Sequence, residues 1–376
     1  TVHALSQLAA IATFAGDADA GDLIESAFDL AQALDLGDTV FAALFVMRGI
    51  HETTTGDYRE SVADLREAAR LSQLAGDHLG SGRALGNLAD VLLAVDPAGS
   101  ADAARQALAH LRRAGGRRLT YAVVINLIQA LILVGSWREA EAVLADAATE
   151  GLASRSILAW VIVLLTALRD GTSSEALASV ELFATSEDPQ DLASVSISHA
   201  LASWAEGDMR GAFESARETL AHAGALGLSS EYVRWGWPLA AEAALRLGNR
   251  PEVNRLLDWL DGHPEGQIPR VLRAERLRIR ARLEASGADG TAGARFEEAV
   301  AAFRELGSPY HLAVGLLDRA EYCSSIGEHE LARELAAEAE EIAGELASRP
   351  LVRRASALLR GQETASAPEE AAVGRS

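Results

Sequence analysis

The stretch TTTGDYRESVADLREAARLSQLAGD runs from Thr53 to Asp77, opens near one Gly-Asp pair and ends on another. Between the two pairs, apolar and small residues recur three and four positions apart, as on one face of an amphipathic helix. Glycine commonly ends a helix, and an aspartate after it can cap the next one. The stretch therefore predicts a single helix held between two tight turns.

The same Gly-containing break returns along most of the chain. From Gly16 to Gly327 the breaks are spaced by roughly 39 residues on average, and a second series falls about midway between them. A period of this size, with helical periodicity between the breaks, predicts paired helices that repeat along the chain. The first series is Gly16, Gly56, Gly99, Gly135, Gly171, Gly207, Gly248, Gly287 and Gly327, and the second is Gly37, Gly76, Gly116, Gly151, Gly227, Gly266 and Gly307.

Small residues occupy fixed positions after these turn glycines. Short side chains there let neighbouring helices approach closely, whereas a leucine would force the helix axes apart. We therefore expect these residues to lie buried between helices. Five residues after a glycine stand Ser61, Ala140, Ala176, Ala212 and Ala332, and twelve after a glycine stand Ala68, Ala147, Ala299 and Ala339.

The composition narrows the class of protein. The chain has 376 residues, a formal net charge of −20, one cysteine (Cys323) and no lysine. The absence of lysine excludes P-loop and Schiff-base chemistry within this chain, and the acidic balance argues against direct nucleic-acid binding. A single cysteine cannot form an intramolecular disulfide, which favours a cytoplasmic location. The longest apolar run, Ile157–Leu168, is too short to cross a bilayer and predicts a buried helix.

Several units resemble the tetratricopeptide repeat. This resemblance covers most of residues 1–347 and implies an all-α, right-handed α-solenoid of about nine tetratricopeptide-like helical hairpins. We expect one repeat domain over residues 1–360 and a disordered tail over residues 361–376. The matching patterns are Gly49 with Asp57-Tyr58, Ser61 and Ala68; Gly135-Ser136-Trp137 with Ala140 and Ala147; Gly207-Asp208 with Ala212; and Gly327-Glu328 with Ala332 and Ala339.

The segment Phe303–Pro350 also resembles the C-terminal repeats of large bacterial signal-transduction NTPase regulators, which are class III cyclase-linked or LuxR-type. The resemblance implies that the repeats sense a ligand or partner and restrain an attached NTPase. The chain begins at Thr1, and no helix-turn-helix pattern follows Pro350. We therefore expect the cyclase-like arrangement, with the repeats last.

The resemblance also implies where a partner would bind. In this repeat class fixed positions of the first helix of each hairpin face a concave groove, and Trp204 and Trp235 fall at such positions, whereas Trp237 falls at a packing position. The same count gives a largely apolar wall of Val46, Ile50, Ile125, Gln129, Ile132 and Val161. An exposed apolar strip with aromatic and arginine anchors is typical of a binding surface. The expected site residues are Trp204, Trp235, Glu242, Arg246, Gln129 and Ile132.

Motifs for chemistry are missing from the sequence. There is no HExxH, CxxC or GxSxG pattern, so we expect no enzyme activity, no metal and no cofactor. The arginine-rich stretch PRVLRAERLRIRAR (Pro269–Arg282) has two interpretations. It is either a solvated helix paired with acidic neighbours such as Glu275, Glu297 and Glu298, or a docking face for an acidic partner or a phosphate-bearing ligand.

Three hypotheses for function follow. The leading one is a non-catalytic regulatory module that takes a peptide or protein segment into its groove. The second is a sensor that wraps a small-molecule effector between repeats five and seven. The third is a scaffold that associates with itself through Ile157–Leu168. None of the three involves a membrane or direct nucleic-acid binding.

Overall fold

The computed structural model describes Ala4, Leu8, Ala12, Thr13 and residues 19–149, 155–285 and 291–366. These residues form α-helices and two short 3-10 helices, and none of them lies in a β-strand. The first half contains α2 (Ala20–Ala33), α3 (Asp38–Thr55), α4 (Tyr58–Leu74), α5 (His78–Leu92), α6 (Pro97–Ala114), α7 (Arg117–Leu133), α8 (Trp137–Thr149), α9 (Arg155–Leu168) and α10 (Ser174–Val180). The second half contains η1 (Glu181–Phe183), α11 (Pro189–Glu206), α12 (Met209–Ala221), α13 (Ala223–Leu226), α14 (Glu231–Arg246), α15 (Arg250–Asp261), η2 (Glu265–Gln267), α16 (Arg270–Ala285), α17 (Ala292–Leu306), α18 (Pro309–Ser325), α19 (His329–Leu346) and α20 (Arg349–Ser366).

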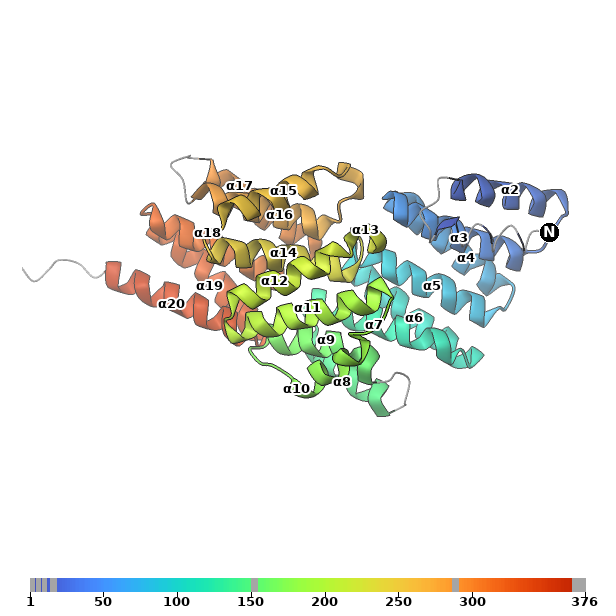
Figure 1. Cartoon of the computed structure of the whole chain (residues 1–376), viewed down its shortest axis with the longest axis horizontal. Coiled ribbons are helices and arrows are strands. Elements are labelled where there is room, and N and C mark those ends of the chain that lie inside the picture. The colour runs from blue at the N-terminus through green and yellow to red at the C-terminus, as the bar shows by residue number, and fades with distance from the viewer. Residues whose placement is uncertain are drawn as a thin grey trace, which may run out of the picture.

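The helices stack in chain order. Each long helix packs mainly on the helix before it and the helix after it, and contacts also join every second helix, such as α3 with α5 and α18 with α20. Figure 1 shows the resulting order of the helices from α2, in blue, to α20, in red. Packing restricted to neighbours in the chain is the defining feature of a solenoid. The predicted all-α solenoid of helical hairpins is confirmed.

Turn glycines and aspartate caps bound many of the helices, as expected. Gly56 and Gly207 have left-handed φ angles of 87° and 82° and end α3 and α11. Asp57 and Asp208 follow them, and each side chain accepts a hydrogen bond from a backbone N–H in the first turn of the next helix. The opening stretch therefore forms the helix that its sequence predicts, α4.

The glycine series is less regular in space than in sequence. Gly99 lies inside α6, whose start is set by Pro97 and by the Asp96 side chain, which accepts a hydrogen bond from the Gly99 N–H. Proline fits the first turn of a helix because N–H groups there have no acceptor within the helix, so the N–H that proline lacks is not needed. Near Gly171 the left-handed conformation belongs to Asp170 instead. Gly16, Gly151 and Gly287 lie outside the described residues.

The small residues lie between helices, as predicted. Every one of them is at most 5% exposed, and Trp237 at its predicted packing position is fully buried. The Trp237 Nε1–H donates a hydrogen bond to the Leu256 carbonyl oxygen at 3.0 Å, so its one polar group is satisfied. The small residues concerned are Ser61, Ala68, Ala140, Ala147, Ala176, Ala212, Ala299, Ala332 and Ala339.

Helix α9 contains the longest apolar run and lies inside the molecule. Its apolar side chains from Leu158 to Leu168 are at least nine-tenths buried, apart from Ile162, and α9 packs against α10 and α11. The predicted buried helix is confirmed. The hypothesis that this strip associates with its counterpart in a second copy is wrong, because neighbouring helices already cover its apolar surface. The Ile157 side chain lies outside the described residues.

The superhelix folds back on itself, so that segments about two hundred residues apart touch. The Tyr58 hydroxyl donates a hydrogen bond to the Gln267 carbonyl oxygen at 3.2 Å. Further along, the Ser348 hydroxyl donates to the Leu168 carbonyl oxygen at 2.7 Å. In Figure 1 the later hairpins lie beside the earlier ones instead of leaving an open arc. Part of the inner wall is therefore covered by the chain itself.

One of these contacts depends on a glycine. A Cβ atom added to Gly56 would lie 2.7 Å from the Cα of Gln267, and the Gly56 φ of 87° also disfavours other residues. Beside it the Gln267 side chain donates a hydrogen bond to the Thr55 carbonyl oxygen at 2.9 Å. We call this contact of Gly56, Thr55, Tyr58 and Gln267 the clasp.

The C-terminal helix extends further than expected. Helix α20 continues to Ser366, so the first residues of the predicted tail at 361–376 are helical, and the remainder lies outside the described residues. Within the described part of the chain, no helix combines the length and the apolarity needed to cross a bilayer.

Candidate binding cavity

The structure separates the residues that the sequence placed in one groove. Gln129 and Ile132 on α7 are 2% and 1% exposed, so neither can meet a partner on an open surface. Val46 and Val161 are buried as well. The expectation of an exposed apolar strip is wrong at these positions, because the superhelix closes and later hairpins cover the early inner wall.

Trp204 and Arg246 form a pair that remains partly accessible. The Arg246 guanidinium carbon lies 4.4 Å from the centroid of the Trp204 ring, a cation–π contact. Arg246 also donates a hydrogen bond from Nε to Glu242 at 3.0 Å. These three residues lie together as the sequence predicted, but Glu242 is only 6% exposed and faces inward. A partner-binding role for Trp204 and Arg246 stays a prediction.

Trp235 packs against the C-terminal hairpins. Its ring centroid lies 5.3 Å from that of His311 and 6.1 Å from that of Tyr310. Tyr310 in turn lies 6.1 Å from Trp137, so aromatic side chains of three distant hairpins meet here. His311 is buried, and burial lowers its pKa to about 3, which keeps the ring neutral. Trp235 is thus half-buried in the closure of the superhelix and does not line an open groove.

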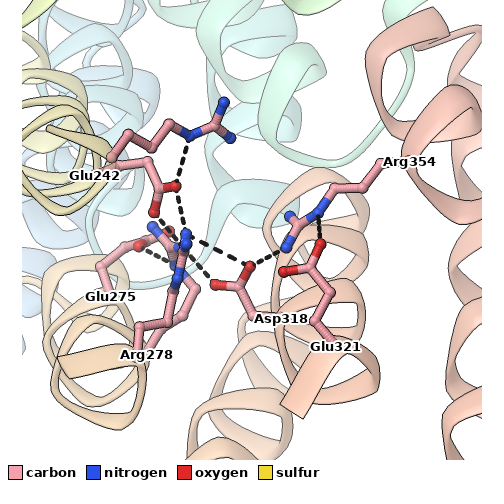
Figure 2. A network of polar contacts seen from close by, with 8 residues as sticks. Glu242, Glu275, Arg278, Asp318, Glu321 and Arg354 are labelled. Carbon is pink, nitrogen blue, oxygen red and sulfur yellow. Dashed lines mark hydrogen bonds and ion pairs between the residues drawn. The ribbon is translucent and has the colours of Figure 1, made fainter. Parts of the chain in front are cut away.

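A cluster of charged residues fills the interior next to Glu242 (Figure 2). Arg278 lies at its centre and is 3% exposed. Its Nη1 lies 2.6 Å from Asp318 and 3.1 Å from Glu242, and its Nε lies 2.7 Å from Glu275. We call the group the charge cluster; its members are Glu242, Arg246, Glu275, Arg278, Arg282, Asp318, Glu321 and Arg354.

The charge cluster is compensated. Its four carboxylates face four guanidinium groups, and Arg354 bridges Asp318 at 2.5 Å and Glu321 at 2.6 Å. Burial acts to raise the pKa of Glu242, but the charges of Arg282 and Arg278 outweigh it and lower the pKa to about 2. The carboxyl of Asp318 is held well below its usual pKa in the same way, mainly by Arg354. With each carboxylate paired to at least one guanidinium, the cluster joins α14, α16, α18 and α20 and has a structural role.

The arginine-rich stretch is explained by the same contacts. Arg278 and Arg282 belong to the charge cluster, while Arg276 and Arg280 pair with Asp261 on α15. Pairing with acidic neighbours is confirmed for Glu275, whereas Glu297 pairs with Arg319 of α18 instead. The helix is largely inside the molecule and engaged with its own chain, so it does not present a docking face.

A cavity of about 1020 Å³ lies at the other end of α14. Ile50 and His51 line it from α3, Asp90 from α5, and Trp259 from α15, while the connection from Ala223 to Ser229 closes one side. The clasp forms part of its rim, since Gly56, Tyr58 and Gln267 also line it. Two segments of chain far apart in sequence thus enclose one space, large for a small-molecule pocket, which typically measures ~300–1000 Å³.

The Asp90 carboxylate at this cavity is unmatched. It lines the space, and it makes no hydrogen bond or ion pair with any described residue. Withdrawal from bulk water raises the pKa of Asp90, and the charge of Arg234 lowers it only in part. Burial also raises the pKa of Glu231, and the charge of Asp90 adds to this rise. Two carboxyl groups therefore share one guanidinium.

That guanidinium is itself poorly satisfied. Arg234 is 5% exposed, and among the described residues its hydrogen-bond partner is Gln129, at a long 3.5 Å. The Nε of Arg234 and the Nε2 of Gln129 have no partner. Burial lowers the pKa of Arg234, while the charges of Glu231 and Asp90 raise it. Arg234 forms no ion pair with described residues, in contrast to the arginines of the charge cluster.

Two further polar atoms at the cavity wall lack partners. Thr13 is 4% exposed and its hydroxyl makes no hydrogen bond. The Nδ1 atom of His51 is also buried without a hydrogen-bond partner. A buried polar atom without a partner costs about 1–3 kcal/mol. A molecule that supplied the missing partners would recover part of this free energy. Unsatisfied polar groups at the wall of a large cavity are therefore the feature that makes it the candidate binding site.

No local motif contains these residues, so the sequence alone did not point to them. Asp90 carried one usable signal: it is a single acidic residue in the otherwise apolar helix segment LADVLLAV, from Leu88 to Val95. A lone charge on an apolar helix face requires either a partner or water. His51 and Thr13 carried no comparable signal. Among the described residues, no group of three or more histidine, cysteine, aspartate or glutamate side chains could hold a metal ion.

Comparison with known proteins yields no family. No family model and no curated protein match this chain. Among solved structures, a Rap protein complexed with competence and sporulation factor is 14% identical, with a TM-score of 0.48 over 88% of this chain and 81% of that chain. The apo form of the quorum sensor NprR from B. thuringiensis is 14% identical, with a TM-score of 0.41 over 85% of this chain and 81% of that chain. A circular tandem repeat protein with a novel repeat topology is 16% identical, with a TM-score of 0.23 over 96% and 94%. These values describe similarity in the arrangement of the backbone only.

Proposed function

We propose that this chain is a non-catalytic binding module that holds a short peptide segment in the cavity between α3, α5 and α13. The observation that supports this most directly is a partly open cavity of about 1020 Å³ whose wall carries unsatisfied polar groups. The wall also offers apolar surface from Ile50, Leu228 and Trp259. A peptide matches this mixture, since it has polar backbone groups and variable side chains.

Binding at this place would act on the whole superhelix. The cavity joins α3 and α4 to the segment from α13 to η2, in part through the clasp. A ligand that touches both sides binds the closed form more tightly than an open one. This difference in affinity shifts the equilibrium toward the closed form. We infer a regulatory role on this basis, with the repeats reporting occupancy to an associated NTPase, cyclase or transcriptional regulator.

The test is affinity selection from a randomised heptapeptide library against the full chain. Gly224 lies at the cavity and an added Cβ would meet no atom within 4 Å, so Gly224→Trp fills the space without a backbone clash. Gly344 on α19 is an exposed helical glycine with equally open surroundings, which makes Gly344→Trp the matched control.

We expect the unmodified chain and Gly344→Trp to retain the same peptides and Gly224→Trp to lose them. Circular dichroism confirms that both variants are folded. Equal retention by all three proteins would place binding elsewhere, and no retention by any of them would contradict a peptide-binding function. A thermal-shift screen with small molecules on the same proteins tests the alternative of a small-molecule effector.

A further inference from the structure

The cavity differs from the charge cluster because it carries a negative charge that no described residue pairs with. Asp90 lines the cavity, and behind the wall its charge acts on that of Glu231 and is offset in part by that of Arg234. Asp90 is reached from the open side of the cavity and Glu231 is partly buried, and neither carboxyl group forms an ion pair with Arg234. A positive charge added beside Asp90 would bring the group of three to neutrality.

Asp90 is placed to meet such a charge. It belongs to α5, and its side chain is accessible from the cavity while α5 itself is buried in the stack. The carboxylate has free acceptor capacity because it makes no hydrogen bond with a described residue. Hydrogen bonds between ionised partners are about twice as strong as neutral ones, and more so away from water.

The histidines that line the cavity do not pair with Asp90. His263 turns its Nδ1 to the Trp259 carbonyl oxygen at 2.9 Å, and His51 has a buried Nδ1 without any partner. Arg234 lies next to Gln129 and is not among the residues that line the cavity. The chain as a whole also carries a net charge of −20, which attracts cations over longer range.

We propose that the peptide bound in the cavity carries a positively charged group, an arginine or lysine side chain or its free α-amine, that pairs with Asp90. This rests on the proposed function, since it assigns the chemistry of the ligand for the same cavity. Asp90 is then a specificity-determining residue: it favours cationic peptides and disfavours acidic ones, because an acidic group would add a third negative charge to the site.

The test compares matched heptapeptide libraries on the full chain. One library contains arginine and lysine, a second replaces them with citrulline and acetyl-lysine, and each is prepared with a free and with an acetylated N-terminus. The proteins are the unmodified chain, Asp90→Asn and Asp29→Asn. Asp29 is exposed on α2, away from the cavity, so both variants change the net charge equally.

We expect the unmodified chain and Asp29→Asn to retain cationic peptides, and Asp90→Asn to bind them about tenfold or more weakly. If retention of the peptides is lost only when citrulline and acetyl-lysine replace arginine and lysine, the charge belongs to a side chain. If retention is lost only when the N-terminus is acetylated, the charge belongs to the α-amine. Peptides that are retained without any positive charge, or that bind Asp90→Asn unchanged, overturn this inference.

The two proposals fail in different ways. Neutral peptides that bind the unmodified chain and are displaced by Gly224→Trp leave the cavity as the binding site and remove only the role of Asp90. Absence of retention from every library removes both proposals. Because Asp90→Asn deletes a charge that has no partner, the variant is expected to fold, and circular dichroism verifies it.

Discussion

Helix α14 carries two groups of buried charges, one toward each end, and they are built differently. Toward its C-terminal end Glu242 joins the charge cluster, where each carboxylate lies within hydrogen-bond distance of a guanidinium and no space remains. Toward its N-terminal end the charges of Glu231 and Arg234 act on Asp90, which lines a large cavity, without ion pairs between the three residues. One helix thus contributes to the fully paired charge cluster at one end and to the charges beside the open cavity at the other.

This difference gives a criterion for distinguishing charges that stabilise the fold of a solenoid from charges that bind a ligand. A buried charge must be compensated, and inside a folded chain the compensation comes either from the chain or from something added to it. The charge cluster is complete by itself. The cavity is incomplete, with unmatched charge, unsatisfied polar atoms and space in the same place.

The largest expected effect tests whether the charge cluster is indispensable to the fold. Replacing Arg278 with methionine leaves three buried carboxylates without their shared partner, and we expect a loss of about 3–5 kcal/mol in the free energy of unfolding. Urea denaturation measures it. The matched control is Arg280→Met on the same helix, where a half-exposed pair with Asp261 should cost less than about 1 kcal/mol. Equal losses in the two variants would show that the cluster is no stronger than a surface pair.

The next effect concerns the clasp at the rim of the cavity. Gly56→Ala combines an unfavourable positive φ with a steric clash against the Gln267 backbone, so we expect destabilisation by about 2–4 kcal/mol. Gly76 has a φ of 69° but open surroundings, so Gly76→Ala should cost only about 1 kcal/mol. Thermal denaturation of both variants gives the difference. If the two alanines behave alike, the contact with Gln267 contributes nothing to closure.

The two groups of charges should respond to pH with opposite signs. The pKa of Glu242 is lowered from 4.5 to about 2, so its stabilising contribution is complete above pH 4.5 and is lost as the pH falls toward 2. The pKa of Asp90 is raised above 3.8, so its ionisation increasingly destabilises the native state as the pH rises past that value. We therefore expect Glu242→Gln to lower stability at pH 7 and Asp90→Asn to raise it.

The measurement is the free energy of unfolding from pH 3 to pH 8, as a difference between each variant and the unmodified chain. The deficit of Glu242→Gln should shrink on acidification, and the gain of Asp90→Asn should shrink as well. A loss of stability in Asp90→Asn at neutral pH would mean that Asp90 has an internal partner, and the comparison between the two regions would then fail.

The smallest effect lies at the accessible edge of the charge cluster. Arg246→Gln removes the cation–π contact with Trp204 and one of several partners of Glu242, so we expect a loss of about 0.5–1 kcal/mol. Tryptophan fluorescence during urea denaturation follows the change at Trp204. A loss as large as that for Arg278→Met would mean that the exposed edge carries as much of the cluster's stability as its buried centre.

The local structure could be predicted from the sequence to a large extent. The period of apolar residues, the glycines that end helices at Gly56 and Gly207, and the aspartates that follow them are short-range signals. The burial of Ala140 or Ala339 also followed, because a small residue at a fixed offset serves the contact with the neighbouring hairpin. Even the longest apolar run was correctly assigned to the interior.

The site was beyond such signals. Gln129 and Ile132 occupy the expected helix positions, yet both are buried, and Arg234, 105 residues further along the chain, lies against Gln129. The cavity exists only because the same closure brings α13 and η2 over α3 and α5.

The stack of helical hairpins could be read from the residues alone, because helix period, capping and close packing are properties of residues near one another in the chain. The place where the stack closes, the charges that find partners within it and the space that stays open could be seen only in three dimensions. Burial and charge compensation depend on contacts such as that of Tyr58 with Gln267, whose partners lie 209 residues apart. No local pattern encodes such a distance.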